Sequence, residues 1–289
     1  MRDKVYIFDI SNFIHRSFHV NLGLETSYGM PVGAVFGTLN MMLRFIDKYK
    51  PTHVLVCYDA QTPKSIRKDI YPLYKANRVQ VQTVSQEERI IRKLFEMLCL
   101  PSVEMEGYEA DDLIATATSK LKQFLDVVIV TGDKDMLQLI EPGVEVFDQM
   151  KNIYYDEAEA LKKFGVRADQ IADYLAIAGD TADNIPGVMG IGPKGAAKLL
   201  GQYGSVFGIY ENINSVESKL KKKLEDSREN AFTSYRLTVL HSDLPVAITP
   251  DSVRFLPKDN PEIYALLDKL EFTNIRVKIE LMWQSYSEV

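Results

Sequence analysis

Short apolar runs rich in β-branched residues alternate with helix-patterned segments as far as about residue 165 of this 289-residue chain. The runs are KVYIFDI (4–10), HVLVCYD (53–59), DVVIVTGD (126–133) and VEVF (144–147). Between the first two, apolar residues of VGAVFGTLNMMLRFIDKYK recur at intervals of three and four, which predicts a crossover helix. Apolar strands separated by helices are typical of parallel sheets covered on both faces. The pattern therefore predicts an α/β fold with a mostly parallel central sheet.

The strand pattern stops after about residue 165, and the rest of the chain is typical of helices. RADQIADYLAIAG and PKGAAKLLGQYG have helical periodicity, and we expect further helices at about 215–240 and 261–270. A chain of this length is long enough for about two domains. We therefore predict an α/β core in residues 1–168 and a helical region in residues 169–289.

The composition is that of a globular protein, with 46% hydrophobic and 26% charged residues. No apolar run is long enough to span a membrane, and Asp9 interrupts the apolar N-terminal stretch, so we expect neither a membrane span nor a signal peptide. Cys57 and Cys99 have apolar neighbours, and we predict that both are buried, reduced thiols. These features favour a cytoplasmic protein.

Carboxylates occur where the predicted strands end and where helices begin or end. They are Asp9, Asp59, Glu109, Asp111, Asp112, Asp133, Asp135, Asp180 and Asp183. One isolated pair has an ordinary structural explanation, because acids stabilise helix N-termini and aspartates are common in turns. Nine are harder to explain in that way. Since chemistry in such sheets collects at the carboxyl ends of the strands, we expect most of these side chains to converge there.

Carboxylates in one partly desolvated site repel one another, and divalent cations relieve that repulsion. Mg²⁺ and Mn²⁺ prefer oxygen ligands, and two such ions are the usual arrangement for phosphodiester hydrolysis. A zinc site is disfavoured because the sequence has no cluster of histidine and cysteine ligands. The carboxylates therefore predict two sites for Mg²⁺ or Mn²⁺.

The net charge, 34 − 40 = −6, would by itself argue against a nucleic-acid partner. Without the nine carboxylates, however, 40 − 9 = 31 acids face 34 bases, a balance of +3. The acidity is therefore largely local to the predicted metal site, and the remaining surface is compatible with DNA.

The segment NIPGVMGIGPKGAAKLL (184–200) combines a glycine-rich turn with the start of a helix at Pro193. Glycines let a backbone approach phosphates, and a helix N-terminus presents free N–H groups to them. This is the helix–hairpin–helix pattern, which we predict at about 173–203 and which binds nucleic-acid backbone without reading bases. The residues assigned to this DNA contact are Gly187, Gly190, Gly192, Lys194 and Lys198. The charge run KLKKK (219–223) is interpreted as a solvated helix face.

Residues 60–84 lack clean periodicity and are strongly basic. Their cations are Lys64, Arg67, Lys68, Lys75 and Arg78. Interleaved aromatic and cationic side chains suit single-stranded nucleic acid, so we assign Arg67 and Tyr74 to DNA contact. A basic surface loop is the alternative that the sequence leaves open. After this segment, Ser85 and Glu88 form a capping box that predicts a helix beginning there.

In order along the chain, DISNFIHRSFH, YDA, YKANR, GYEADD, TGDKD, GDTADN and GVMGIGPKGA resemble the motifs of the 5′-nuclease (flap endonuclease) family. Within that family the chain resembles the 5′→3′ exonuclease domain of bacterial DNA polymerase I and its free-standing forms. The resemblance covers nearly the whole chain. It implies a PIN-like 5′-nuclease core with a helical arch at about 60–98, followed by the helix–hairpin–helix region.

The resemblance also implies roles for individual residues. A first metal group corresponds to Asp9, Asp59, Glu109, Asp111 and Asp112, and a second to Asp133, Asp135, Asp180 and Asp183. Lys75 and Arg78 correspond to cations that contact the scissile phosphate, and Arg16 corresponds to an arginine near the first strand. The hairpin glycines fit a K⁺ site. Two positions depart from the family pattern: Ile10 replaces a glycine, and His15 replaces an aromatic residue that stacks on the terminal base.

The implied activity is structure-specific 5′→3′ exonuclease and 5′-flap endonuclease cleavage of DNA and RNA primers during replication and repair, by two-metal-ion catalysis. We expect DNA with 5′ flaps, nicks or 5′ ends as substrate, no membrane partner, a monomer, and a functional link to a DNA polymerase. A junction-binding protein without catalysis is one alternative. A phosphohydrolase of the haloacid dehalogenase type is another, but it needs an aspartate two residues after Asp9, where Ser11 stands.

Overall fold

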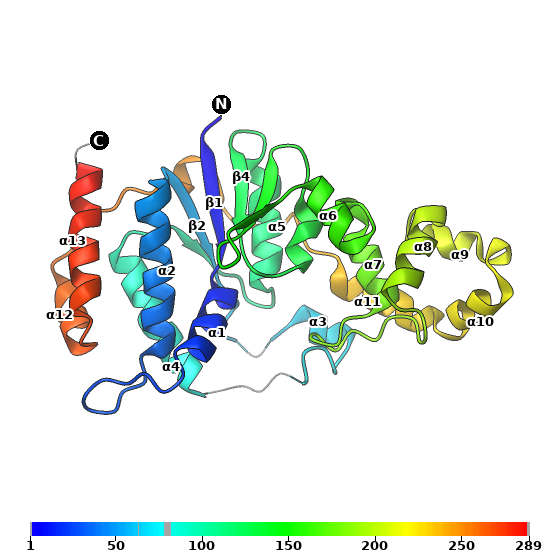
Figure 1. Ribbon diagram of the computed structural model, residues 1–289, viewed down its shortest axis with the longest axis horizontal. Helices are drawn as coiled ribbons and strands as arrows, with labels where there is room; N and C mark the ends of the chain where they lie inside the picture. The colour runs from blue at the N-terminus through cyan, green and yellow to red at the C-terminus, as the bar shows by residue number, and fades with distance from the viewer. Residues whose placement is uncertain (1, 63, 78–81, 288–289) are drawn as a thin grey trace.

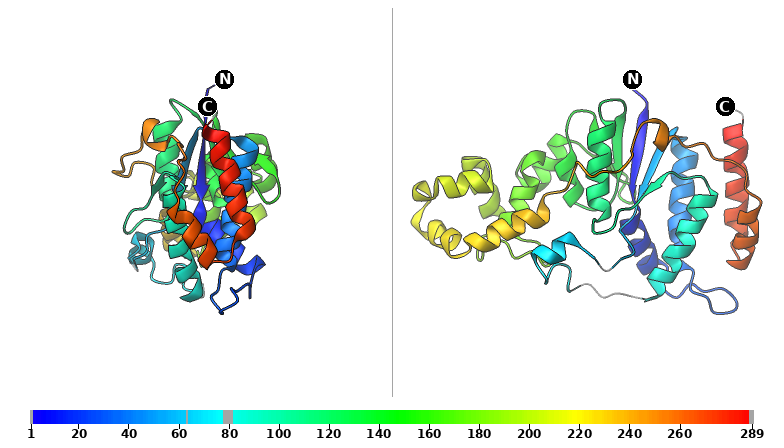
Figure 2. Two further views of the ribbon diagram at one scale, coloured as in Figure 1. Left: turned by 90° about the vertical axis from the view of Figure 1, so that its left-hand side faces the viewer. Right: turned by 180° about the vertical axis from the view of Figure 1, so that it is seen from behind.

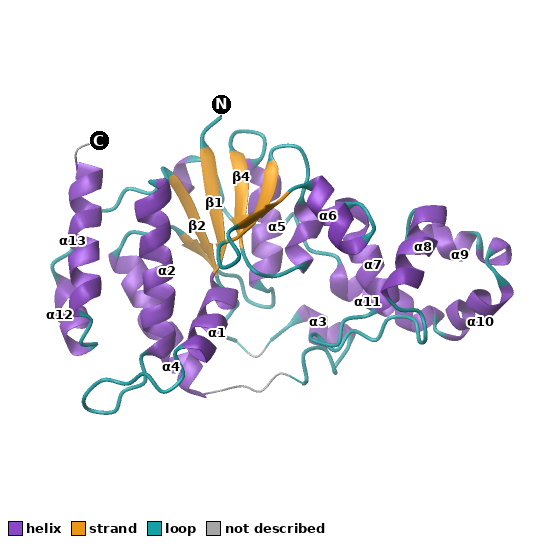
Figure 3. Cartoon of the chain, viewed as in Figure 1, coloured by secondary structure: helices purple, strands orange, loops and turns teal. Residues whose placement is uncertain are grey.

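A six-stranded sheet in the order β3-β2-β1-β4-β5-β6 lies at the centre of the structure, a computed structural model that describes residues 2–62, 64–77 and 82–287 (Figure 1). The strands are β1 Lys4–Asp9, β2 His53–Cys57, β3 Ser102–Val103, β4 Asp126–Val130, β5 Val144–Asp148 and β6 Ile153–Tyr155. Strands β1 to β5 pair in parallel, and β6 runs antiparallel to β5. The carboxyl ends of β1, β2 and β4 therefore lie on the same edge of the sheet (Figure 3).

Side chains of the strands alternate between two apolar cores, one on each face of the sheet. Val5 and Ile7 of β1 pack into one core, and Tyr6 and Phe8 pack into the other. Because both faces are covered, apolar residues are favoured at every position of a central strand. This is the physical reason for the uninterrupted apolar runs in the sequence.

The helices cover both faces and also form an extension beside the sheet (Figures 1 and 2). The N-terminal half contains α1 Ile10–Val20, α2 Gly33–Tyr49, α3 Ile66–Ile70, α4 Gln82–Met97, α5 Ala110–Leu121 and α6 Glu157–Phe164. The C-terminal half contains α7 Ile171–Ala178, α8 Pro193–Tyr203, α9 Val206–Glu211, α10 Ser218–Asp226, α11 Arg228–Thr238, α12 Glu262–Lys269 and α13 Thr273–Ser287. Short 3₁₀ helices are η1 Asp135–Leu139, η2 Ala168–Gln170, η3 Ile213–Ser215 and η4 Asp251–Val253.

The C-terminal helices return to the core after the extension. Apolar side chains of α12 and α13 share a core with α1, α2 and α4, while α5, α7 and α8 contribute to the core on the other face. Figure 2 shows α13 beside α2, far from the extension formed by α8, α9 and α10. The chain thus closes its core with residues from both of its ends.

The predicted α/β class and mostly parallel sheet are confirmed, and the four predicted strands are all present, with three of them ending one to three residues before the predicted boundary. The crossover helix is α2. The prediction that a helix begins at Ser85 is wrong, because α4 already begins at Gln82 and includes Ser85. Among the described residues, no helix combines the length and apolarity needed to cross a membrane.

The prediction of two buried thiols is correct for Cys57 and wrong for Cys99. Cys57 lies in β2 and is fully buried, whereas Cys99 is exposed in the turn that follows α4. Cys99 has a φ of 57°, so the chain turns sharply there. Its apolar neighbours Leu98 and Leu100 are both buried, while the thiol side chain faces outward.

The glycine-rich turn between α7 and α8 packs its backbone closely. Gly187 has a φ of +62° and a Cβ atom there would lie 2.5 Å from the backbone nitrogen of Gly179. No side chain fits at that distance, so this contact requires glycine. The backbone N–H of Gly187 donates to Ser234 Oγ of α11 at 3.0 Å, which ties the hairpin to the helical region.

Candidate active site

Four carboxylates line one cavity of about 480 Å³ at the carboxyl edge of the sheet. They are Asp9, Asp59, Asp111 and Asp133. Asp9 is the last residue of β1, Asp111 lies in the first turn of α5, and the other two follow β2 and β4. Lys75 and His15 also line this cavity. The parallel sheet therefore joins residues that lie far apart in the sequence.

Thr131, the residue that follows β4, orients two of these carboxylates. Its hydroxyl donates to Asp9 Oδ2 at 2.7 Å and accepts from the backbone N–H of Asp133 at 3.0 Å. Asp9 Oδ1 accepts from the backbone N–H of Asn12 at 3.1 Å, so both of its oxygens are held. Thr131 was not among the predicted site residues, although the sequence places this hydroxyl residue at the end of a strand and before two aspartates.

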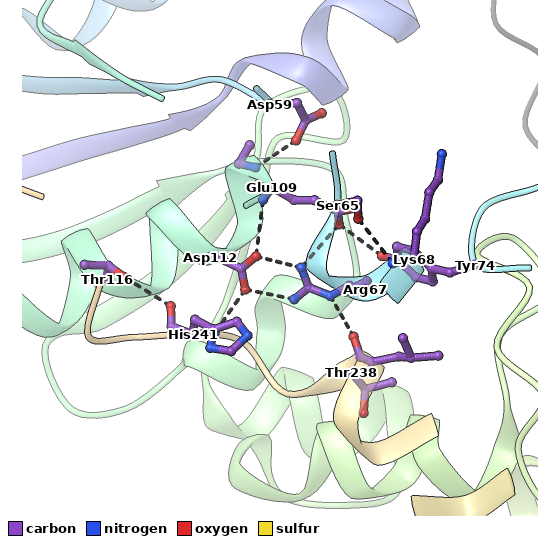
Figure 4. Close-up of polar contacts among 12 residues, drawn as sticks. Asp59, Ser65, Arg67, Lys68, Tyr74, Glu109, Asp112, Thr116, Thr238 and His241 are labelled. Atoms are coloured by element: carbon purple, nitrogen blue, oxygen red, sulfur yellow. Dashed lines mark hydrogen bonds and ion pairs between the residues drawn. The ribbon is translucent and has the colours of Figure 1, made fainter. Parts of the chain in front are cut away.

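Asp59 is held by its neighbours on two sides. Its Oδ1 accepts from the backbone N–H of Ala110, the first residue of α5, at 2.7 Å (Figure 4). Arg92 of α4 donates to the backbone carbonyl of Asp59 at 2.9 Å, and its guanidinium lies 3.9 Å from the ring centre of Tyr58. Arg92 was not among the predicted site residues.

Lys75 and Tyr74 join Glu109 to Asp183. Lys75 Nζ lies 2.8 Å from Glu109 Oε2 and 3.7 Å from Asp183 Oδ2. The Tyr74 hydroxyl lies 3.0 Å from the same Glu109 oxygen and 3.4 Å from Asp183 Oδ2. Burial opposes a charge on Lys75, but Glu109 and the other nearby carboxylates together raise the pKa of its ammonium above the usual value. Lys75 is therefore a cation fixed at the cavity wall.

A second group of carboxylates continues from Asp133. Its Oδ1 accepts from the backbone N–H of Asp135 at 2.9 Å, and Asp180 pairs with Lys134 at 2.9 Å. The Oδ1 atom of Asp135 is buried and has no hydrogen-bond partner among the residues that the structure describes. A buried carboxylate oxygen without a donor is energetically costly, so this atom marks a place suited to a cation.

Burial and mutual repulsion act on three of these groups. Burial, followed by the nearby Asp133 charge, raises the pKa of Asp9 to about 7, although Thr131 opposes the shift. Burial raises the pKa of Asp135 to about 7, with further contributions from Asp133 and Asp180. Burial and the neighbouring Asp9 and Asp133 charges raise the pKa of Asp111 well above its usual range despite the opposing Lys75 charge. Each raised pKa shows that negative charge on that carboxyl group is unfavourable without a counter-ion.

The residues present fit hard divalent cations. The donors are carboxylate oxygens, several of them desolvated, and Asp135 offers an unpaired one. As the described side chains stand, no three of them meet in a geometry that holds one ion. Mutual repulsion favours such a spread arrangement, and a bound cation would draw the oxygens together.

Replacing Asp135 by Asn should stabilise the metal-free protein increasingly as the pH rises from 5 to 8. A folded-state pKa of about 7 lies above the ordinary value, so the folded protein binds this proton more tightly than the unfolded chain. The wild-type group is therefore most favourable below its ordinary pKa, and that advantage is lost as the pH rises through 7. The difference in the free energy of unfolding should reach between about 1 and 4 kcal/mol. Urea titrations of both proteins in chelator would measure it, and a pH-independent difference would contradict the prediction.

Asp112 does not face the cavity, contrary to its assignment to the first metal group. Arg67 donates to both of its oxygens, at 2.6 and 2.8 Å, and the backbone N–H of His241 donates at 3.0 Å (Figure 4). Burial alone would raise the pKa of Asp112, but Arg67 and the backbone donors hold it below its usual range. We therefore exclude Asp112 from the proposed metal ligands.

Two residues assigned to DNA contact are buried instead. Arg67 is 5% exposed and its Nε donates to the backbone carbonyl of Leu237 at 2.9 Å. Tyr74 is 3% exposed, with its ring in a small apolar cluster that includes Ile185. Neither side chain reaches the surface, so neither fits stacking on or pairing with a nucleic-acid strand. Alternation of cations and aromatics cannot distinguish a binding surface from a side-chain network that closes a fold.

The remaining residues assigned to substrate contact lie around the cavity or on the hairpin. His15 and Arg16 are exposed on α1, and Arg16 lines a small cavity with Gly132. Lys194 and Lys198 are exposed on α8. Arg78 lies outside the described residues.

The hairpin carbonyl of Gly190 already has a cation beside it. Lys223 Nζ of α10 donates to this oxygen at 2.6 Å, so one lysine of the charge run is not simply solvated. A K⁺ ion at this oxygen would have to displace the ammonium group. The K⁺ site expected from the glycines therefore stays a prediction.

Family models match both parts of the chain. The model described as 5′-3′ exonuclease, N-terminal resolvase-like domain, matches residues 4–165. The model described as 5′-3′ exonuclease, C-terminal SAM fold, matches residues 166–261.

Curated relatives agree with these matches. A 5′-3′ exonuclease of Aquifex aeolicus is 33% identical over 286 residues, which cover 98% of this chain and 98% of that protein. DNA polymerase I of Caldicellulosiruptor bescii is 37% identical over 286 residues, which cover 96% of this chain and 34% of the polymerase. The chain thus spans about a third of the length of that polymerase.

Solved structures share the fold at low sequence identity. T5 5′-exonuclease, in a structure with bound divalent metal ions (zinc), has a TM-score of 0.69 at 22% identity, covering 96% of this chain and 99% of that chain. Flap endonuclease-1 from Methanococcus jannaschii has a TM-score of 0.62 at 17% identity, covering 99% and 93% respectively. With both family models matched in sequence order and a carboxylate-lined cavity at the sheet edge, the chain belongs to the 5′-3′ exonuclease family.

Proposed function

We propose that this protein is a divalent-metal-dependent 5′ nuclease that hydrolyses phosphodiester bonds of DNA, and of RNA primers, at 5′ ends, nicks and 5′ flaps. The observation that carries the proposal is the cavity in which Asp9, Asp59, Asp111 and Asp133 face the fixed cation Lys75. Family membership supports the reaction class, and the flap endonucleases among the fold neighbours support the substrate class. We infer a cytoplasmic monomer that acts beside a DNA polymerase, since polymerase I proteins contain a homologous segment.

The carboxylates would hold two ions, with Mg²⁺ or Mn²⁺ as the favoured pair. The proposed ligands are Asp9, Asp59, Glu109, Asp111, Asp133, Asp135, Asp180 and Asp183. When bound, such ions neutralise the carboxylates, polarise a phosphate group and lower the pKa of water. The T5 structure contains zinc, so Zn²⁺ belongs among the ions tested.

The residues of the chain would align the scissile phosphate and exclude other positions for it. Thr131 and Ala110 hold Asp9 and Asp59 in fixed orientations through hydrogen bonds of 2.7 Å each. Lys75 would place its ammonium beside the scissile phosphate and offset the charge that develops there. His15, at the cavity mouth, would stack on the terminal base, Arg78 would contact the scissile phosphate together with Lys75, and Arg16 would pair with a nearby phosphate.

Cleavage of a 5′-labelled flap oligonucleotide, with Mg²⁺, Mn²⁺ or Zn²⁺ added or withheld, tests the proposal. We expect metal-dependent products that end in a 5′-phosphate and a 3′-hydroxyl. Tight binding of the flap without cleavage under any of these metals would instead indicate the junction-binding alternative. The haloacid dehalogenase alternative is already excluded by the family assignment.

Binding to DNA should weaken steeply with salt, because the proposed contacts are mainly to phosphates. Each phosphate neutralised contributes about −0.9 to the slope of log affinity against log salt concentration. Replacing both Lys194 and Lys198 with Gln should therefore make the slope less steep by about 2, measured by fluorescence anisotropy in Ca²⁺. Lys4→Gln, at the opposite edge of the sheet, serves as control and should leave the slope unchanged. An unchanged slope in the double variant would show that the hairpin is not part of the DNA-binding surface.

A further inference from the structure

Residues 71–77, at the base of the proposed arch, lie against the turn that carries Asp180 and Asp183. Two asparagine side chains connect the two segments reciprocally. Asn184 Nδ2 donates to the backbone carbonyl of Leu73 at 2.7 Å, and Asn77 Nδ2 donates to the backbone carbonyl of Thr181 at 2.8 Å. Each segment thus supplies one amide and one carbonyl. We call Asn77 and Asn184 together the amide clasp.

The amide clasp flanks a strained residue. Lys75 has a φ of 52°, in the left-handed region that lysine rarely adopts, and its backbone N–H donates to the carbonyl of Asp183 at 3.0 Å. Asn184 has a φ of 56° on the other side of that bond. Such conformations persist only where surrounding contacts enforce them, and they concentrate at functional sites. Here the surrounding contacts include the two amides, the bond between Lys75 and Asp183, and the turn bonds from the Tyr74 N–H to Tyr71 and from the Ala76 N–H to Leu73.

The backbone of Lys75 determines where its ammonium lies. From this conformation Nζ reaches 2.8 Å from Glu109, and the side chain lines the cavity with Asp9, Asp111 and Asp133. An extended conformation at Lys75 would send the side chain in a different direction. The apolar contacts of Tyr74 with Ile185 and Leu237 attach the segment to the protein.

We propose that Asn77 and Asn184 are positioning residues that hold Lys75 over the scissile phosphate and couple it to the Asp183 turn. This inference rests on the proposed nuclease function. The amide groups of both asparagines donate to backbone carbonyls, those of Leu73 and Thr181, and would act through Lys75. Loss of either amide should therefore reduce turnover while leaving substrate binding, which depends on many phosphate contacts, nearly unchanged.

The main test compares two glycine substitutions. Asn184→Gly removes the amide but keeps a backbone that tolerates a positive φ. Asn152→Gly makes the same change at a φ of 54° in the turn between β5 and β6, and is the matched control. We expect Asn184→Gly to lower kcat on the flap substrate by about 10-fold with KM within about 2-fold, and Asn152→Gly to change neither. Equal kcat values for wild type and Asn184→Gly would overturn the proposal.

A double-mutant cycle distinguishes positioning from a general structural role. If the amide acts through Lys75, then Lys75→Ala combined with Asn184→Gly should be no slower than Lys75→Ala alone. Multiplied losses in the double variant would show that Asn184 acts independently of Lys75, and would overturn the inference. Asn77→Ala should behave as Asn184→Gly does in the same cycle.

Hydrogen exchange provides a readout that does not depend on cleavage. In metal-free, DNA-free protein, the amide of Lys75 should exchange faster in Asn184→Gly than in wild type, whereas Asn152→Gly should leave it unchanged. Unchanged exchange in Asn184→Gly would count against the clasp even if turnover fell. If the wild type fails to cleave any flap, the proposed function fails instead, and the exchange result still decides whether the clasp exists.

Discussion

Replacing Asp133 by Asn should lower the rate of flap cleavage at saturating Mg²⁺ by at least about 10³-fold, equivalent to about 4 kcal/mol of transition-state stabilisation. Asp133 lies between the two carboxylate groups: its charge acts on Asp9 and Asp111 on one side and on Asp135 on the other. It is thus the residue most able to contribute to both proposed ion sites. The substitution keeps the side-chain size, so the loss measures the charge and the donor oxygen.

The same variant should fold at least as stably as the wild type in chelator. Removing one charge from a repelling group relieves the repulsion that, together with burial, raises the pKa of Asp9 and Asp135. Asp126→Asn is the matched control, since Asp126 begins the strand that Asp133 follows and lies at the opposite edge of the sheet. The control should cleave at the wild-type rate. If the folded Asp133→Asn variant cleaves the flap at more than a tenth of the wild-type rate, the carboxylate cavity is not the catalytic centre.

Replacing Arg67 by Met should destabilise the protein by about 3 to 5 kcal/mol, because the buried Asp112 would lose its partner. Asp112 is fully buried, and Arg67 makes two short hydrogen bonds to it (Figure 4). The pair joins α5 to the segment after β2, and Arg67 Nε also bonds the carbonyl of Leu237 in α11. A single pair therefore connects the core, the base of the proposed arch and the helical region.

Urea unfolding at neutral pH would measure the effect. Arg67→Met combined with Asp112→Leu should recover part of the loss, since no unpaired buried charge remains. Arg276→Met is the control: the Arg276 side chain is 40% exposed and pairs with Asp268 and Glu280, so its loss should cost at most about 1 kcal/mol. If Arg67→Met lowers the free energy of unfolding no more than the control does, the buried pair does not stabilise the fold as predicted.

The pair also gives a pH dependence opposite in sign to that of Asp135. The folded-state pKa of Asp112 lies below its ordinary value, so the stabilisation is present above the ordinary carboxyl pKa and is lost as the pH falls through the folded-state value. Asp135 contributes most at low pH and least at high pH. The pH dependence of stability therefore has opposite directions for Asp112, which serves the fold, and for Asp135, which serves the proposed metal site.

The sequence determined which elements form and which of their ends carry acids. Uninterrupted apolar runs predicted the strands because a central parallel strand is buried on both faces, as Val5 and Tyr6 on opposite sides of β1 illustrate. Asp9 and Asp133 were predictable as neighbours because adjacent parallel strands end on the same edge. The order of short motifs was enough to identify the family, since each motif combines a strand or helix end with its acids.

Only the tertiary structure decided which residues of one motif serve chemistry and which serve the fold. Asp111 and Asp112 are adjacent in sequence, yet successive helical residues point about 100° apart, so one lines the cavity and the other is buried against Arg67. Arg67 and Tyr74 looked like surface residues because composition carries no information on what a segment packs against. Thr131, Arg92 and the amide clasp act through a few hydrogen bonds between distant segments, and such bonds leave no periodic pattern in a sequence.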